Sequence, residues 1–212
     1  MITKLFHYLT GLAILLLLLA GCGGQADKVL LVADERLEDE DMLKLFITEE
    51  VNVMVDLLEK AGYEAVVASP SGEPIVAGTA TLTPDMKLAD ANVDDYMGFV
   101  FPCMGQDLEP PNPDPDALRL AREAASQAKP IAAQVGGVGT LGEAEVLNGK
   151  HFAFPEGLAY VIPDGIYDGI GVVQDGNIIT SGTCPFMAMM TGNENKTTEL
   201  TQGFIDMLAS AQ

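Results

Sequence analysis

Histidine and cysteine are scarce in this chain of 212 residues, and tryptophan is absent. Of two histidines and three cysteines, His7 and Cys22 lie in the N-terminal segment, which leaves His151, Cys103 and Cys184 for the rest. The usual zinc sites of cysteine and histidine are therefore excluded, because too few of these residues are available as ligands. A single histidine beside Lys150, expected to be exposed, is also a poor supply for a Ser-His-Asp or Cys-His relay.

Positive charge is scarce as well, since 11 Lys and Arg face 31 Asp and Glu, a net charge of −20. Residues 1–21 contain Lys4 and no carboxylate, so the chain that follows them has a net charge of −21. A surface of this sign repels phosphate backbones, and no nucleic-acid partner is expected. Solubility explains the charge more simply than a specific cationic ligand does.

The N-terminus resembles a bacterial lipoprotein signal. Lys4 precedes an apolar run over residues 12–20, which is too short to span a bilayer comfortably and ends at Leu-Ala-Gly-Cys22. We expect residues 1–21 to be a signal peptide, Cys22 to be lipidated, and residues 22–27 to form a tether. The domain would then lie in the cell envelope, anchored to a membrane and outside the cytoplasm. A plain secretory signal and a short membrane anchor are the alternatives.

From residue 28 to 212, strand and helix signals alternate. Short apolar runs at 28–33, 63–69, 97–102 and 130–134 predict buried parallel strands, and Asp175-Gly176 predicts a hairpin. Helices are expected up to Ala61-Gly62, over about 116–128, from the turn after residue 134 to residues 147–149, and at the C-terminus. Asp114 or Asp116 is the expected N-cap of the second of these. The pattern predicts one α/β domain: a three-layer α/β/α sandwich with a flavodoxin-like, mostly parallel sheet.

Residues 130–140 (PIAAQVGGVGT) predict a strand, a glycine-rich turn and a helix. In α/β folds such an elbow often presents a nucleophile, but here Val135 occupies it and has no reactive group. The glycines lack the Lys-Ser/Thr of a P-loop and the full spacing of a dinucleotide fingerprint, so no cofactor is expected.

Three other residues could carry chemistry. Glu50 shares the apolar helix face of Ile47, Val51 and Met54, so it either lines a pocket or reaches solvent at the helix flank. Cys103 and Cys184 each follow a predicted strand, and each is a nucleophile, half of a disulfide, or an apolar filler. Ligands of parallel sheets bind beyond the carboxyl ends of the strands, where all three residues are expected.

Several segments together resemble the ThiJ/PfpI family of the class I glutamine amidotransferase-like superfamily. They are residues 57–62 (LLEKAG), 83–88 (TPDMKL) with 94–96 (DDY), 120–124 (LAREA), 146–150 (VLNGK) and 175–181 (DGNIITS). This family includes protease-like proteins and glyoxalase or deglycase enzymes, and the resemblance covers roughly residues 28–210.

The resemblance implies that Glu50 is the family's glutamate and that Val135 stands at its cysteine. Gly136 stands at a histidine position, Phe154 near another, and Gly182 at an arginine. Cys103 and Met104 replace the two glycines that supply oxyanion-hole amides. Without a nucleophile, valine cannot form the family's covalent intermediates.

Three hypotheses follow. In the first, the protein is not catalytic and binds a small ligand or a partner through a remodelled pocket formed by Glu50, Cys103, Met104, Val135, Gly136, Phe154 and Cys184. In the second, it is a hydrolase or a glyoxalase-like enzyme in which Cys103 is a relocated nucleophile and Glu50 tunes it. In the third, Cys103 and Cys184 form a disulfide, which is compatible with the first. The resemblance also makes a homodimer a possible assembly, and no metal site is expected.

Overall fold

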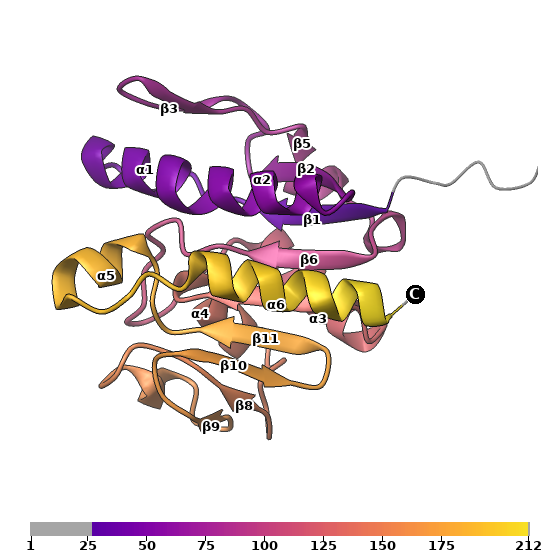
Figure 1. The fold of residues 1–212 in the computed structure, drawn as a ribbon, viewed down its shortest axis with the longest axis vertical. Coiled ribbons are helices and arrows are strands. Elements are labelled where there is room, and N and C mark those ends of the chain that lie inside the picture. The colour runs from indigo at the N-terminus through magenta and orange to yellow at the C-terminus, as the bar shows by residue number, and fades with distance from the viewer. Residues whose placement is uncertain (1–26, 212) are drawn as a thin grey trace, which may run out of the picture.

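The computed structural model describes residues 27–211, and the predicted signal peptide and Cys22 lie outside them. A seven-stranded sheet forms the centre of the molecule (Figure 1). In spatial order its strands are β10 (Val172–Asp175), β11 (Ile178–Ser181), β7 (Ile131–Gln134), β6 (Gly98–Phe101), β1 (Lys28–Val32), β2 (Glu64–Ser69) and β5 (Met86–Lys87). All neighbours are parallel except β10 and β11, which form the hairpin predicted at Asp175-Gly176.

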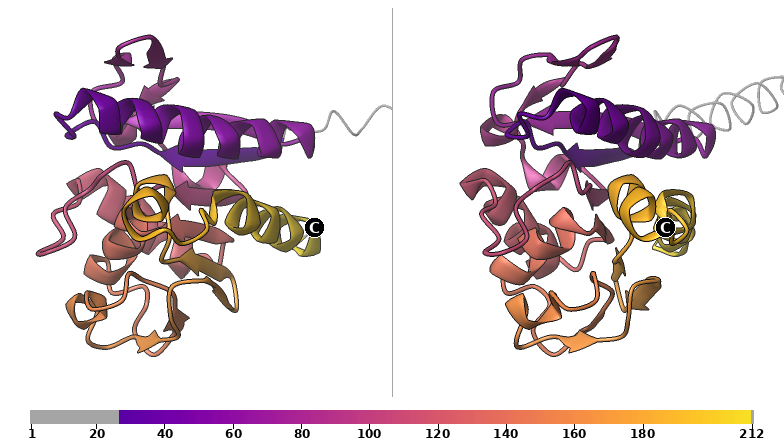
Figure 2. Two further views of the ribbon diagram at one scale, coloured as in Figure 1. Left: turned by 60° about the vertical axis from the view of Figure 1, so that its left-hand side comes forward. Right: turned by 90° about the vertical axis from the view of Figure 1, so that its left-hand side faces the viewer.

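Helices cover both faces of the sheet, so the predicted three-layer α/β/α sandwich is confirmed (Figure 2). One face carries α1 (Glu40–Phe46), α2 (Asn52–Lys60), α5 (Pro185–Thr191) and α6 (Thr197–Ser210), and the other carries α3 (Pro115–Ser126) and α4 (Gly136–Glu143). Asp114 is the N-cap of α3, because its Oδ1 accepts a hydrogen bond of 2.8 Å from the Asp116 amide.

Two core clusters lie between these layers. The first packs Phe46, Met54 and Leu58 of the α1–α2 side with Phe204 of α6 against one face of the strands. The second packs residues of α3 and α4 with Phe152 and Phe154 against the other face. Central strands such as β1 and β6 have almost no exposed surface, which explains their continuous apolar sequences.

A π-helical turn, Ile47–Val51, joins α1 and α2 into one continuous helix. The Asn52 amide bonds the Ile47 carbonyl, five residues back, which widens the helix by one residue. Glu50 lies in this turn and is fully buried, as are Ile47 and Val51. The predicted apolar helix face is therefore confirmed, and Glu50 does not reach solvent.

The structure differs from the sequence prediction at three places. Helix α4 ends at Glu143 instead of residues 147–149, because Glu145 has a left-handed φ of 62° and the chain turns there. Helix α5 was not predicted. The third is β9 (Ile166–Tyr167), which was not predicted and which pairs in parallel with β8 (His151–Phe152), where His151 is exposed as expected.

Between β2 and β6 the chain forms a small hairpin of β3 (Ile75–Ala77) and β4 (Ala80–Leu82), then β5 and two 3-10 turns, Leu88–Asp90 and Val93–Asp95. A third 3-10 turn covers Ala159–Val161. Within residues 27–211, no helix combines the length and apolar character that a bilayer span requires.

Candidate functional site

The predicted elbow connects β7 to α4 at Val135. This residue has φ 43° and ψ −95°, a conformation that is a genuine outlier for a β-branched side chain. Its amide donates to the Ser181 carbonyl at 2.9 Å, and its carbonyl accepts from the Gly139 amide at 3.1 Å. The backbone therefore has the sharp bend of a nucleophile elbow, although the side chain there is apolar.

Close packing enforces this bend. A Cβ atom on Gly137 would lie 1.9 Å from the Phe101 carbonyl oxygen of β6, so only glycine fits there. The start of α4 consequently lies against the end of β6. That approach brings the loop after β6, which contains Cys103 and Met104, next to the elbow.

Glu50 fixes that loop. Its Oε1 accepts a hydrogen bond of 2.8 Å from the Cys103 amide, and its Oε2 accepts one of 3.1 Å from the Met104 amide. Burial raises the pKa of Glu50 to about 7, and the hydrogen bonds from Cys103 and Met104 partly oppose this. Both oxygens are engaged by backbone amides, so neither serves as a base toward the Cys103 thiol.

The Cys103 thiol is buried beside the elbow and is only 3 % exposed. Burial raises its pKa well above the ordinary value, as do the neighbouring Cys184 thiol and the Glu50 carboxyl. The Gly136 amide donates to the sulfur and lowers the pKa, with the smallest effect of these. The thiol is therefore protonated at neutral pH, which makes it a weak nucleophile.

Six of the seven predicted pocket residues gather around the elbow. They are Glu50, Cys103, Met104, Val135, Gly136 and Cys184, and each of them is buried. As the structure stands, they form a packed cluster instead of an open pocket. The seventh, Phe154, packs with Phe152 in the second core cluster on the opposite face of the sheet. Its expected place in the pocket is wrong.

The two cysteines are free thiols in this structure, and the possible disulfide between them stays a prediction. They are nevertheless neighbours, because after burial the nearby Cys184 thiol is the next cause that raises the pKa of Cys103.

Packing also excludes the side chains that the family resemblance would place here. A Cβ on Gly136 would lie 2.6 Å from the Cys103 carbonyl oxygen. A Cβ on Gly182 would lie 2.6 Å from the carbonyl atoms of Phe154. Neither a histidine at 136 nor an arginine at 182 fits without backbone movement.

Two cavities open at the carboxyl edge of the sheet beside the closed cluster. A crevice of about 100 Å³ lies between the ends of β1 and β6 and is lined by Asp34, Arg36, Leu37, Glu38, Gly105, Gln106 and Asp107. This is the position where the strand order reverses, the usual ligand site of such sheets. Arg36 binds Asp34 through its Nε at 3.0 Å, and this interaction raises the pKa of Arg36.

The second cavity, of about 310 Å³, lies beyond the end of β11 and beside α5. Its lining comprises Pro155, Glu156, Ile170, Gly182, Thr183, Met187, Thr191 and Asn193. It includes residues directly beyond the carboxyl end of a strand, where ligands were expected, and its volume is within the range of small-molecule sites. The sequence prediction missed most of it because α5 was missed. Pro185 immediately after an extended residue was the available signal, since proline favours the first turn of a helix.

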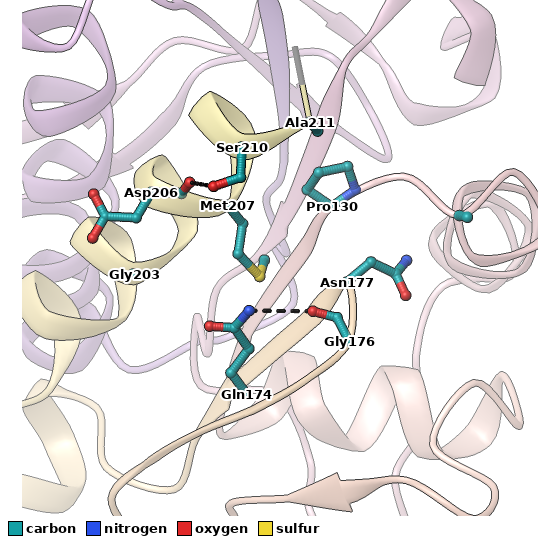
Figure 3. A pocket seen from close by; sticks show the side chains of 10 residues that line it. Pro130, Gln174, Gly176, Asn177, Gly203, Asp206, Met207, Ser210 and Ala211 are labelled. Atoms are coloured by element: carbon teal, nitrogen blue, oxygen red, sulfur yellow. Dashed lines mark hydrogen bonds between the residues drawn. The ribbon is translucent and has the colours of Figure 1, made fainter.

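A larger cavity, of about 380 Å³, lies at the opposite edge of the sheet, between α6 and the β10–β11 hairpin (Figure 3). Pro130, Asn177 and Met207 are among the residues that line it. Ser210 and Gln174 at its rim bond backbone carbonyls, those of Asp206 at 2.8 Å and Gly176 at 3.2 Å. It lies at the amino ends of the strands, remote from the elbow.

The model of the DJ-1/PfpI family matches residues 28–191. The chain belongs to the DJ-1/PfpI family. Solved structures agree with this assignment. A ThiJ/PfpI domain protein from Brachyspira murdochii has a TM-score of 0.67 at 17 % identity, with 88 % of this chain and 99 % of that chain covered. DJ-1beta from Drosophila melanogaster has a TM-score of 0.56 at 21 % identity, with 88 % and 97 % covered. A comparison with curated proteins finds no match.

Within the DJ-1/PfpI fold, this chain thus has a closed elbow. Among residues 27–211, no group of three or more His, Cys, Asp and Glu is placed to hold a metal ion. The arrangement can position backbone amides and bury a carboxyl group, and it presents no exposed nucleophile at the elbow.

Glu50 should make the stability of the fold pH-dependent. Its pKa is about 7 in the fold against 4.5 ordinarily, so the native state holds a proton that the unfolded chain has released between these values. Stability from this group is greatest below about pH 4.5 and falls as the pH rises to about 7, by on the order of 3 kcal/mol. Urea unfolding at several pH values measures this slope. In Glu50→Gln the free energy of unfolding should fall less over this pH range, by on the order of 3 kcal/mol. A pH dependence equal to that of the wild type would contradict the raised pKa of Glu50.

Proposed function

We propose that this DJ-1/PfpI protein is not catalytic at its elbow and acts by binding a small ligand or a partner while anchored to a membrane outside the cytoplasm. The observation that carries the proposal is Val135 in the strained elbow conformation, with φ 43° and only 1 % of its surface exposed. Covalent catalysis at this position requires a nucleophilic atom, and valine has none.

The alternative of an enzyme with Cys103 as its nucleophile has one observation in its favour, the Gly136 amide that donates to the Cys103 sulfur. Three features count against it: the thiol is buried, its pKa is raised, and both Glu50 oxygens are bound to amides. A substrate would have to displace the loop that Glu50 holds before it could reach the sulfur.

Turnover measurements separate these two readings. We expect the wild-type chain to consume methylglyoxal or cleave a peptide no faster than the matched Cys103→Ser variant, because neither has an accessible nucleophile. The serine variant defines the background of the preparation. Saturable turnover that is lost in both Cys103→Ser and Glu50→Gln would establish the enzyme instead.

Ligand binding is best supported at the cavity of about 310 Å³ beside Gly182. It lies next to the closed cluster, at the edge of the sheet where this fold binds ligands. Ile170 and Met187 supply apolar surface, Thr183 and Asn193 supply polar atoms, and Glu156 is the one charged residue of its lining. A small amphipathic molecule that is neutral or cationic suits this lining better than an anion.

Blocking the cavity should abolish binding. Thr191 is exposed at its rim, and its hydroxyl bonds a carbonyl of its own helix, that of Met187, at 2.7 Å. Ser210 is a matched control at the remote cavity, exposed and bonded in the same way. A fragment panel in a thermal-shift assay should yield compounds that stabilise wild type and Ser210→Trp but not Thr191→Trp. Equal shifts in all three chains would place the ligand elsewhere.

Membrane anchoring rests on the sequence around Cys22, which lies outside the described residues. Lipid on Cys22 would hold the domain in the cell envelope, outside the cytoplasm, through the six-residue tether 22–27.

Cys22→Ser tests the anchor. The wild-type chain should fractionate with membranes and carry a lipid mass on Cys22, because the acyl chains insert into the bilayer. The variant should lack that lipid and keep an uncleaved N-terminus. Gly24→Ser, a change in the same tether, serves as the control and should behave as wild type. An unmodified Cys22 in the membrane-bound wild type would rule out the lipoprotein assignment.

A further inference from the structure

Two cysteines flank the elbow from opposite sides. Cys103 follows β6 and Cys184 follows β11, and these strands are the two neighbours of β7 in the sheet (Figure 1). Beyond the strand ends, both side chains belong to the first core cluster, which also contains Val135. The elbow residue thus has one cysteine on each side.

Each cysteine is held in place by a polar side chain that bonds the backbone at or directly before the cysteine. The Cys103 amide is bound to Glu50, as described above. On the other side, the Gln134 side-chain amide donates to the carbonyl of Thr183 at 2.7 Å, directly before Cys184. Cys184 is then the N-cap of α5. Cys103 is therefore held from the π-helical turn, and the segment before Cys184 is held from Gln134, the residue directly before the elbow.

The thiols face each other and not solvent. Cys184 is fully buried, Cys103 is nearly so, both belong to the first core cluster, and the Cys184 thiol is near enough to raise the pKa of Cys103. Buried structural cysteines in apolar surroundings are inert toward external reagents. Here, however, the nearest reactive group of each thiol is the other thiol.

We propose that Cys103 and Cys184 are a disulfide-forming pair that links the loop after β6 to the start of α5 across Val135. The free thiols in this structure are the reduced form of the pair. The proposal does not depend on the function proposed above, although a disulfide would remove Cys103 as a candidate nucleophile.

The bond forms by exchange with a disulfide-bearing oxidant, such as glutathione disulfide or a protein dithiol oxidase. One protein thiolate attacks the oxidant disulfide, which gives a mixed disulfide and releases one oxidant thiolate. The second protein thiolate attacks the protein sulfur of that mixed disulfide and releases the other. The protein loses two protons and two electrons, and the oxidant gains them as two thiols.

Burial sets when this exchange takes place. An oxidant cannot reach either sulfur in the closed fold, so the bond should form while the chain folds in an oxidising compartment. Once formed, it should resist reduction for the same reason. The bond also constrains the unfolded chain between residues 103 and 184, which should raise thermal stability.

Refolding in a defined redox buffer tests the pair. Full-length Cys22→Ser, solubilised in detergent, has Cys103 and Cys184 as its only thiols. The denatured, reduced chain is refolded with reduced and oxidised glutathione or with reduced glutathione alone, then denatured and labelled with N-ethylmaleimide. In the oxidising buffer we expect no label, a mass lower by two hydrogens, and a cross-linked peptide of the two cysteines.

The thermal midpoint of the oxidised chain should exceed that of the reduced chain by roughly 5–15 °C. The same chain with Cys103→Ser should keep one thiol or one glutathione and show no such difference. If the Cys103→Ser variant does not fold, the comparison of the oxidised and the reduced form of the Cys22→Ser chain still tests the proposal. Two maleimide labels, or a glutathione on each cysteine after oxidative refolding, would overturn the proposal.

Discussion

The contact of Glu50 with the amides of Cys103 and Met104 organises this end of the molecule. It connects the π-helical turn between α1 and α2 to the loop after β6, two segments that are more than fifty residues apart. Because the carboxyl group is fully buried, it can be kept there only by such partners. The loop that it holds covers the elbow, and the closed state of the whole cluster follows from this one contact.

Packing around two glycines also keeps the cluster closed. Gly136 and Gly182 have no room for a side chain, since backbone carbonyl atoms of Cys103 and Phe154 occupy the space. A cysteine restored at position 135 would still lack a neighbouring imidazole or guanidinium. Several coordinated backbone movements would be needed to reopen the site.

Much of this arrangement could be predicted from the sequence, because it depends on periodicity and local turn signals. The parallel strands, the elbow and the place of Glu50 on the apolar helix face follow from apolar runs, glycines and helical spacing, whereas the spacing left open whether Glu50 reaches solvent. What could not be predicted depends on distances between segments. The packing of Cys103 against Gly136 has no local signature, and the place of Phe154 on the opposite face of the sheet depends on a short loop. The seven-residue helix α5 was too short to show a clear period.

The strained backbone of Val135 has a wider consequence for how active sites are located. Such strain is usually taken as a mark of catalysis, since it tends to cluster where reactive side chains are positioned. In this protein such dihedral angles occur at an inert side chain, next to the close contact of Gly137 with β6. The bend is a property of how this sheet and helix join. A search for enzymes by backbone geometry alone would select this chain, and the side chain at the bend is what corrects the assignment.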